Sequence, residues 1–155
     1  MNKVIAIIPA RWGSTRLPGK PLADINGKTM IQWVYEAVQK SDADKVIVAT
    51  DHKDIVNEVN RFGGNVIMTD VKHRTGTERV LEAYQSYKDD YDLVINIQGD
   101  EPIINEEDIN DLICVLKRNK FNIATLVGQI TNKQRLDRNT VKAILDNEEI
   151  VMFTR

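Results

Sequence analysis

The sequence has one cysteine and no long apolar run, and each of these shortages excludes a class of protein. A single cysteine, Cys114, among 155 residues excludes a disulfide scaffold. No apolar run approaches the roughly 18 residues that a membrane span needs, which predicts no membrane insertion. The apolar stretch at residues 4–8 is short and no small-residue cleavage site follows it. We therefore expect no signal peptide and a cytoplasmic location.

The sequence also lacks an excess of basic charge. Its 21 lysines and arginines are balanced by 23 acidic residues, which gives a formal net charge of −2. A protein that binds nucleic acid usually has a basic excess, so we expect no nucleic-acid partner. Hydrophobic residues at 42% and charged residues at 28% are ordinary for a globular domain and exclude a disordered chain.

The charges that are present are distributed unevenly. Residues 1–20 contain four cations and no acid, whereas residues 89–111 contain nine acids and no cation. The charge count alone favours two solvated faces of opposite sign. The alternative is that a cationic loop and an acidic segment meet around a polyphosphate and its metal ion.

Strand-length apolar runs alternate with helical periodicity along the whole chain. The expected strands are residues 4–8, 45–50, 65–69, 93–97, 123–127, 141–145 and 150–155. Apolar residues at helical spacing lie between them, for example Ile31, Val34, Tyr35 and Val38. This alternation predicts an α/β fold, a three-layer Rossmann-like sheet with helices on both faces. With no linker or repeat, we expect one nucleotide-binding α/β domain over residues 1–155.

The turn after the first strand is the most specific feature. Ligands of open α/β sheets bind beyond the carboxyl ends of the strands, where this loop lies. Its small residues let backbone amides approach phosphate oxygens, and Arg11, Arg16 and Lys20 can neutralise charge. It is not a P-loop, because Pro21 stands where that motif needs a hydroxyl. The alternative is a basic surface loop without a ligand.

The loop sequence IPARWGSTRLPGKPL, residues 8–22, resembles the signature of sugar nucleotidyltransferases, in the form used by 3-deoxy-manno-octulosonate (Kdo) cytidylyltransferases. The resemblance continues through ATDH at 49–52, HRTGTER at 73–79, NIQGDEP at 96–102 and NTVK at 139–142. It covers essentially the whole chain. Sialic-acid cytidylyltransferases share the opening of the loop but diverge after it.

The resemblance implies a nucleotide-diphospho-sugar transferase fold and a reaction of CTP with a 3-deoxy-2-keto sugar acid. The products are a CMP-sugar and pyrophosphate, Mg²⁺ is the cofactor, and the role is in lipopolysaccharide precursor synthesis. The catalytic residues it implies are Arg11, Lys20 and Asp100, with Asp100 as the magnesium ligand. The nucleotide-binding residues it implies are Ala10, Arg11, Ser14, Arg16, Lys20, Thr75, Gly76, Arg79 and Gln98.

Two of these residues also have ordinary structural interpretations. Asp100 lies in a Gly-Asp-Glu-Pro turn, where aspartate is common. Thr75 can cap the following helix, with Glu78 as its capping-box partner, and such a cap is compatible with a nucleotide contact.

Other residues are expected to have structural roles. We interpret Asp51, together with Asp54, as a helix cap, His52 and His73 as turn or surface residues, and Cys114 as a small buried core residue. Trp12 either packs under the loop or lines the mouth of the pocket.

Family members are substantially longer than 155 residues. By the resemblance, their C-terminal portion supplies a second metal carboxylate, most contacts to the sugar acid and the homodimer interface. We therefore expect a C-terminally truncated chain that carries the CTP-binding half, lacks the dimer-forming part and is poorly active alone. Two alternatives are a non-catalytic nucleotide-binding module and a nucleotidyltransferase for sialic acid or a hexose 1-phosphate.

Overall fold

A computed structural model describes residues 2–13, 17–118, 122–147 and 149–155. The chain divides into two compact units, residues 1–124 and residues 125–155, which are described separately. That one α/β domain spans residues 1–155 stays a prediction. None of the helices in the described ranges has the length and apolar character that a bilayer crossing requires.

The first unit is built on a parallel sheet with the strand order β5-β4-β1-β6. Its elements in chain order are β1 (Val4–Ala10), the 3₁₀-helix η1 (Lys20–Leu22), β2 (Asp24–Ile25), β3 (Lys28–Thr29), α1 (Met30–Gln39), β4 (Lys45–Thr50), α2 (Lys53–Arg61), β5 (Val66–Met68), α3 (Gly76–Gln85), β6 (Leu93–Asn96) and α4 (Glu106–Lys117). The four expected sheet strands of this unit are confirmed.

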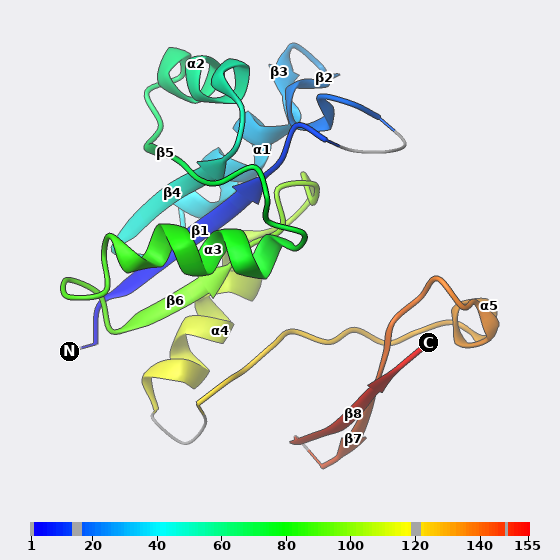
Figure 1. The fold of residues 1–155 in the computed structure, drawn as a ribbon. Coiled ribbons are helices and arrows are strands. Elements are labelled where there is room, and N and C mark those ends of the chain that lie inside the picture. The colour runs from blue at the N-terminus through cyan, green and yellow to red at the C-terminus, as the bar shows by residue number, and fades with distance from the viewer. Residues whose placement is uncertain (1, 14–16, 119–121, 148) are drawn as a thin grey trace. The chain divides into compact units, whose positions relative to one another are not determined.

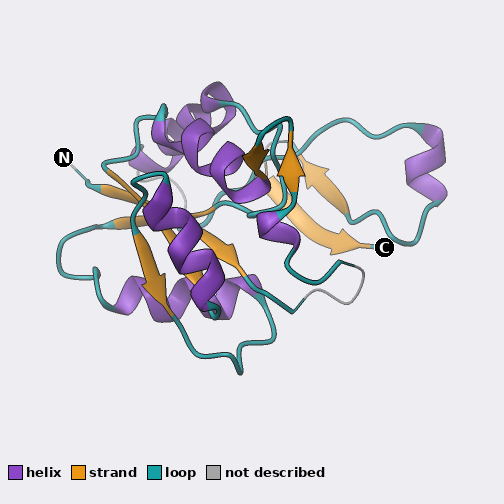
Figure 2. Cartoon of the chain, turned by 90° about the horizontal axis from the view of Figure 1, so that it is seen from above, coloured by secondary structure: helices purple, strands orange, loops and turns teal. Residues whose placement is uncertain are grey.

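Side chains of β1 alternate between two hydrophobic cores, one on each face of the sheet. Val4 and Ile8 pack with residues of α1, α2 and α4, whereas Ile5 and Ile7 pack with Val80 of α3. Both faces of a parallel strand are buried, which is why β1 reads as a continuous apolar run. Helices therefore cover both faces of the sheet (Figures 1 and 2), and the predicted three-layer fold is confirmed.

A short hairpin formed by β2 and β3 was not predicted. Asn26 and Gly27 connect the two strands and both have positive φ, 53° and 83°. Asn-Gly is the preferred dipeptide for a two-residue turn with left-handed φ at both positions, so the signal is present in the sequence.

Two expectations about the first unit are wrong. Cys114 on α4 is exposed rather than buried, because its neighbours Ile113 and Leu116 form the buried side of the helix. Asp51 does not cap α2. His52 is the N-cap, and its Nδ1 accepts a hydrogen bond of 3.2 Å from the backbone N–H of Asp54.

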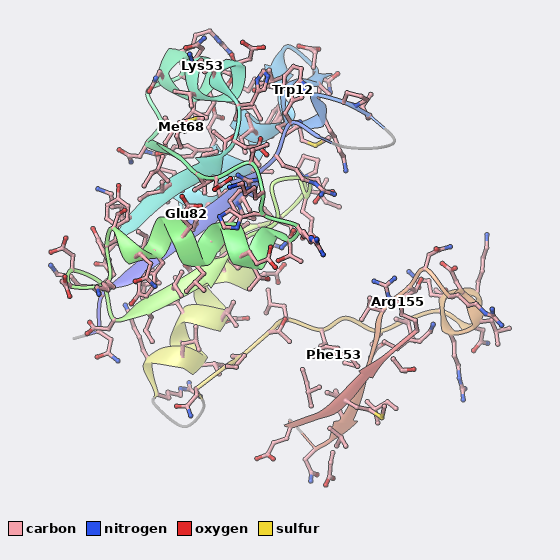
Figure 3. The ribbon with its side chains drawn as sticks, viewed as in Figure 1. Trp12, Lys53, Met68, Glu82, Phe153 and Arg155 are labelled. Carbon is pink, nitrogen blue, oxygen red and sulfur yellow. The ribbon has the colours of Figure 1, made fainter. Side chains whose placement is uncertain are left out.

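The second unit contains α5 (Asn132–Leu136) and an antiparallel hairpin of β7 (Lys142–Asp146) and β8 (Glu149–Thr154). The strands expected near 141–145 and 150–155 are thus present. Phe153 on β8 is exposed (Figure 3). The strand predicted at residues 123–127, across the boundary of the two units, is wrong: this segment is irregular and Ile123 is 86% exposed. Among the described residues the segment pairs with no strand, and strand propensity alone does not form a strand without such pairing.

Candidate functional site

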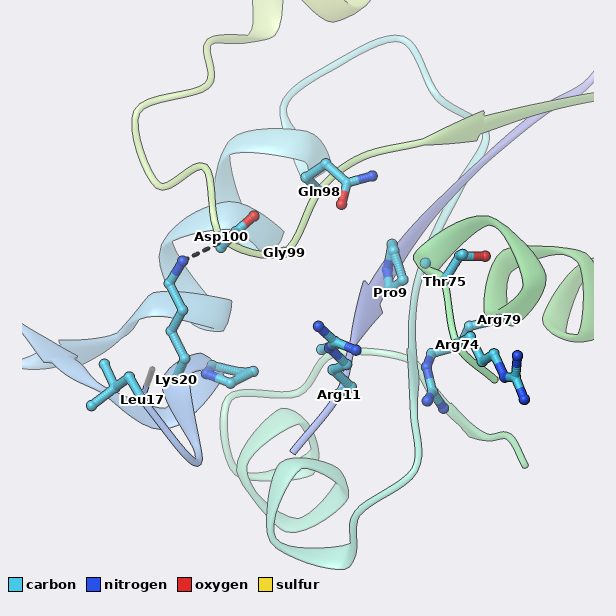
Figure 4. Close-up of a pocket in the computed structure, with 13 residues that line it drawn as sticks. Pro9, Arg11, Leu17, Lys20, Arg74, Thr75, Arg79, Gln98, Gly99 and Asp100 are labelled. Carbon is cyan, nitrogen blue, oxygen red and sulfur yellow. Dashed lines mark hydrogen bonds and ion pairs between the residues drawn. The ribbon is translucent and has the colours of Figure 1, made fainter. Parts of the chain in front are cut away.

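A cavity of about 630 Å³ lies in the first unit, where β1 and β6 end (Figure 4). Three segments form its walls: the end of β1 with the loop that follows it, the start of α3, and the turn after β6. Its lining residues are Pro9, Ala10, Arg11, Leu17, Lys20 and Pro21 from the first segment, Arg74, Thr75, Gly76 and Arg79 from the second, and Gln98, Gly99 and Asp100 from the third.

Two glycines let these segments approach one another closely. A Cβ atom on Gly99 would lie 2.8 Å from the backbone oxygen of Pro9, which is too close for any side chain. A Cβ atom on Gly76 would lie 3.2 Å from Cγ of Pro9. The start of α3 and the turn after β6 therefore both pack against the end of β1.

The first turn of α3 is fixed by a capping box. Oγ1 of Thr75 accepts from the backbone N–H of Glu78 at 3.2 Å, as predicted. In return, the backbone N–H groups of Arg74 and Thr75 donate to the Glu78 carboxylate and lower its pKa. The cap holds the positive end of the helix dipole at the cavity wall, an arrangement that suits an anion.

Lys20 and Asp100 form an ion pair at the cavity. Nζ of Lys20 lies 2.6 Å from Oδ2 of Asp100, with the side chains 34% and 53% exposed. Arg11 and Arg74 are also exposed side chains, and Arg11 lies between the Lys20–Asp100 pair and the residues of α3 in Figure 4. Three cationic side chains and one carboxylate thus line the same cavity.

Arg74 is the cation that the sequence interpretation missed. It stands directly before Thr75, the N-cap of α3, and a cation next to a helix N-cap in the sequence is a signal for an anion-binding position. The loop that carries it is held by Glu82 of α3, whose carboxylate accepts from the backbone N–H of Asp70 at 2.9 Å and contacts the ring of His73. These contacts, the Asp70 bond first, lower the pKa of Glu82.

Arg79 lines the cavity, but its guanidinium points away from it (Figure 4). One nitrogen donates to Oδ2 of Asp51 at 2.7 Å, and the other donates to Oγ1 of Thr69 at 2.5 Å. The side chains of Arg79 and Asp51 are only 3% and 8% exposed. A nucleotide contact of Arg79 stays a prediction.

Trp12 packs under the loop and does not line the mouth of the cavity. Its ring stacks on His52 with centroids 3.9 Å apart, and it also lies against Gly19, where a Cβ atom would be 3.2 Å from the ring. Gly19 has a φ of 68° and its N–H donates to the Trp12 oxygen at 3.1 Å. These contacts close the base of the loop.

Most of the predicted site residues therefore surround one cavity. These are Ala10, Arg11, Lys20, Thr75, Gly76, Arg79, Gln98 and Asp100. Ser14 and Arg16 lie outside the described residues. The roles of all these residues in binding or catalysis stay predictions.

The cavity offers one carboxylate to a metal ion. Within the described ranges, no group of three or more histidine, cysteine, aspartate and glutamate side chains could hold a metal. Mg²⁺ commonly binds one or two protein carboxylates together with substrate phosphates and water, so the half-exposed Asp100 fits such an ion once a nucleotide is bound.

Comparisons with known proteins show the family of the chain. The sequence model of the family described as cytidylyltransferase matches residues 5–155. A 3-deoxy-manno-octulosonate cytidylyltransferase of Fusobacterium nucleatum is 49% identical over 99% of this chain and 63% of its own length. The corresponding protein of Parabacteroides distasonis is 48% identical over 100% of this chain and 64% of its own length.

A solved structure has the same fold. CMP:2-keto-3-deoxy-manno-octonic acid synthetase complexed with CTP superposes with a TM-score of 0.93 at 39% identity, over 98% of this chain and 64% of that one. The chain thus spans less than two thirds of the length of these relatives.

Proposed function

The chain belongs to the cytidylyltransferase family, and from this premise we propose that it binds CTP in the cavity between β1, α3 and β6. We further propose that it is part of an enzyme that transfers CMP from CTP to Kdo, in lipopolysaccharide precursor synthesis. The proposal for CTP is supported by the solved relative, which is complexed with CTP. The proposal for Kdo is supported by the names of the curated relatives.

The observation that carries the proposal is the charge around the cavity. Arg11, Lys20 and Arg74 supply three cations, and the first turn of α3 adds the positive end of a helix dipole. A nucleoside triphosphate brings several negative charges, so such a site binds it by neutralisation and by charge-assisted hydrogen bonds. A merely structural loop has no need of these cations.

In the proposed reaction the anomeric hydroxyl of the sugar acid attacks the α-phosphorus of CTP. A bond forms between that oxygen and the α-phosphorus, the bond from the α-phosphorus to the bridging oxygen breaks, pyrophosphate leaves and the hydroxyl proton passes to water. Such transfers depend on positioning and on charge stabilisation more than on covalent help. Arg11 and Lys20 would stabilise the negative charge that develops on the leaving pyrophosphate.

We propose Asp100 as the protein ligand of Mg²⁺. Bound there with phosphate oxygens and water, the ion would neutralise phosphate charge and polarise the α-phosphate. Asp100 belongs to the turn after β6, and Gly99 holds that turn against the end of β1. The backbone of Asp100 therefore lies close to the end of β1, where the loop that carries Arg11 begins.

The homodimer of the family, the cytoplasmic location and the role of the remaining length of the relatives in binding the sugar acid stay predictions. All three belong to the whole protein.

Pyrophosphate release tests the proposed reaction. The protein encoded by the complete reading frame is given CTP, Mg²⁺ and one acceptor at a time: Kdo, N-acetylneuraminate or glucose 1-phosphate. We expect release with Kdo and background release with the other two, and slow release from residues 1–155 alone. Faster release with N-acetylneuraminate or glucose 1-phosphate would overturn the Kdo assignment. Release without any acceptor would point to hydrolysis instead.

A further inference from the structure

Asp51 connects two walls of the cavity without lining it. It follows the last residue of β4, and its two carboxylate oxygens have different partners. Oδ1 accepts from the backbone N–H of Trp12 at 3.0 Å, and Oδ2 accepts from the guanidinium of Arg79 at 2.7 Å. Trp12, labelled in Figure 3, belongs to the loop after β1, and Arg79, labelled in Figure 4, belongs to α3.

Each partner lies next to residues of the proposed nucleotide site. Trp12 follows Arg11 directly, so a fixed Trp12 amide also fixes the backbone at Arg11. Arg79 lies one helical turn after Thr75, so a fixed guanidinium holds the start of α3 in place. Asp51 therefore joins the cationic loop to α3 through two hydrogen bonds.

Capping does not account for Asp51, because His52 caps α2. Stability is also a weak reason for a buried ion pair, since replacing such a pair by apolar residues is often neutral or stabilising. The pair is nevertheless embedded in a satisfied network: Thr69 accepts from Arg79 and donates to the Thr50 oxygen at 3.0 Å. Among the described residues, no buried side-chain nitrogen or oxygen lacks a partner.

We propose that Asp51 is a positioning residue of the nucleotide site, which holds the loop of Arg11 and the N-terminus of α3 at the separation that a triphosphate requires. This inference rests on the proposed function, because it names CTP as the ligand whose binding depends on that separation. Asp51 itself does not touch the nucleotide, and its effect passes through Trp12 and Arg79.

The substitution Asp51→Asn tests the inference. It preserves the shape of the side chain but removes its charge, and its NH2 group must face one of the two donors, the Trp12 N–H or the Arg79 guanidinium. We expect the Kd for CTP to rise roughly 10- to 100-fold, the effect of losing about one hydrogen bond to a charged group when a wall of the site is misplaced. In a Trp33→Phe background, Trp12 is the single remaining tryptophan, and its emission should shift in the Asp51→Asn variant because its backbone contact is altered.

Asp54→Asn is the matched control. It removes the same charge three residues away, and Asp54 is an exposed side chain that contacts His52 at 3.6 Å rather than either wall. A core substitution on α4, Ile113→Ala, lowers stability at a residue that does not line the cavity. Both should leave the Kd for CTP within about twofold of the unsubstituted chain, because the groups that meet the nucleotide keep their positions.

The outcomes are distinguishable. If the unsubstituted chain does not bind CTP, the proposed function fails. If it binds CTP and a folded Asp51→Asn variant binds equally well, only the inference fails. If Asp51→Asn does not fold, Arg79→Lys replaces it, because lysine keeps the charge but cannot reach Asp51 and Thr69 with a planar fork. Unchanged CTP binding by a folded Arg79→Lys variant would then overturn the inference.

Discussion

The Lys20 ammonium lies 2.6 Å from the Asp100 carboxylate and joins the loop after β1 to the turn after β6 at the cavity. The residue proposed to bind phosphate thus neutralises the residue proposed to bind the metal ion. Binding of CTP with Mg²⁺ would give each of them a new partner of opposite charge. The pair therefore keeps both side chains at the cavity in the chain without a nucleotide.

Lys20→Ala is expected to weaken CTP binding roughly 10- to 100-fold, because a hydrogen bond to a charged group contributes about 1.5–3 kcal/mol. Calorimetric titration of CTP in the presence of Mg²⁺ measures the change. Lys28→Ala is the matched control, since Lys28 forms an ion pair of the same length, 2.6 Å, with Glu36 and does not line the cavity. Equal loss of affinity in the two variants would contradict the phosphate role of Lys20.

Gly99→Ala is expected to lower the free energy of unfolding by about 1–3 kcal/mol, the usual cost of overpacking a well-packed site. The new methyl group would lie 2.8 Å from the Pro9 oxygen, so β1 and the turn after β6 must separate. Gly128→Ala is the control, because its new methyl group would meet nothing within 4 Å. Urea unfolding compares the variants. Equal stability of Gly99→Ala and the unsubstituted chain would contradict the close approach.

Thr75→Ala is expected to destabilise the protein by about 0.5–2 kcal/mol through the loss of the α3 cap. It should also weaken CTP binding, because the first turn of α3 then frays at the cavity wall. Thr75→Ser keeps the hydroxyl that accepts from Glu78 and should retain both properties. Thermal unfolding and CTP titration provide the two measurements, and a Thr75→Ser variant as impaired as Thr75→Ala would argue against the cap.

The lowered pKa of Glu58 predicts that the free energy of unfolding depends on pH. Its carboxylate accepts from Arg61 and from Thr29, and these hydrogen bonds, the one from Arg61 first, lower its pKa. The stabilisation is therefore fully present above the unfolded pKa of about 4.3 and is lost as the pH falls through the lower folded value.

Unfolding free energies of the unsubstituted chain and of Glu58→Gln should thus differ most near pH 7 and converge in acid. Urea unfolding between pH 7 and pH 3 measures the difference between the two curves. A difference that grows on acidification would show that the pKa of Glu58 is raised rather than lowered.

Much of the fold follows from the sequence because buried parallel strands read as apolar runs. β1 and β4 lie in the centre of the sheet and are apolar on both faces, which makes them readily recognisable. Residues 123–127 are similarly apolar but belong to no strand pair in the part of the chain that the structure describes, and only tertiary pairing distinguishes the two cases. Likewise, the exposure of Cys114 depends on which side of α4 meets the sheet.

Site residues can be predicted from the sequence where their contacts are local. The Thr75–Glu78 capping box is local, so sequence spacing was sufficient. Sequence alone favours a local cap for Asp51, because its partners in the structure, Trp12 and Arg79, are 39 and 28 residues away in the sequence. Long-range pairs of this kind become visible only when the fold brings them together.

A calorimetric titration of residues 1–155 with CTP, in the presence of Mg²⁺, tests most directly the claim that the cavity binds CTP. The cationic cavity predicts saturable heat with one CTP bound per chain, and membership of the cytidylyltransferase family predicts weaker binding of ATP. No saturable heat with CTP, or equal affinity for ATP, would contradict the assignment of this cavity as a CTP site.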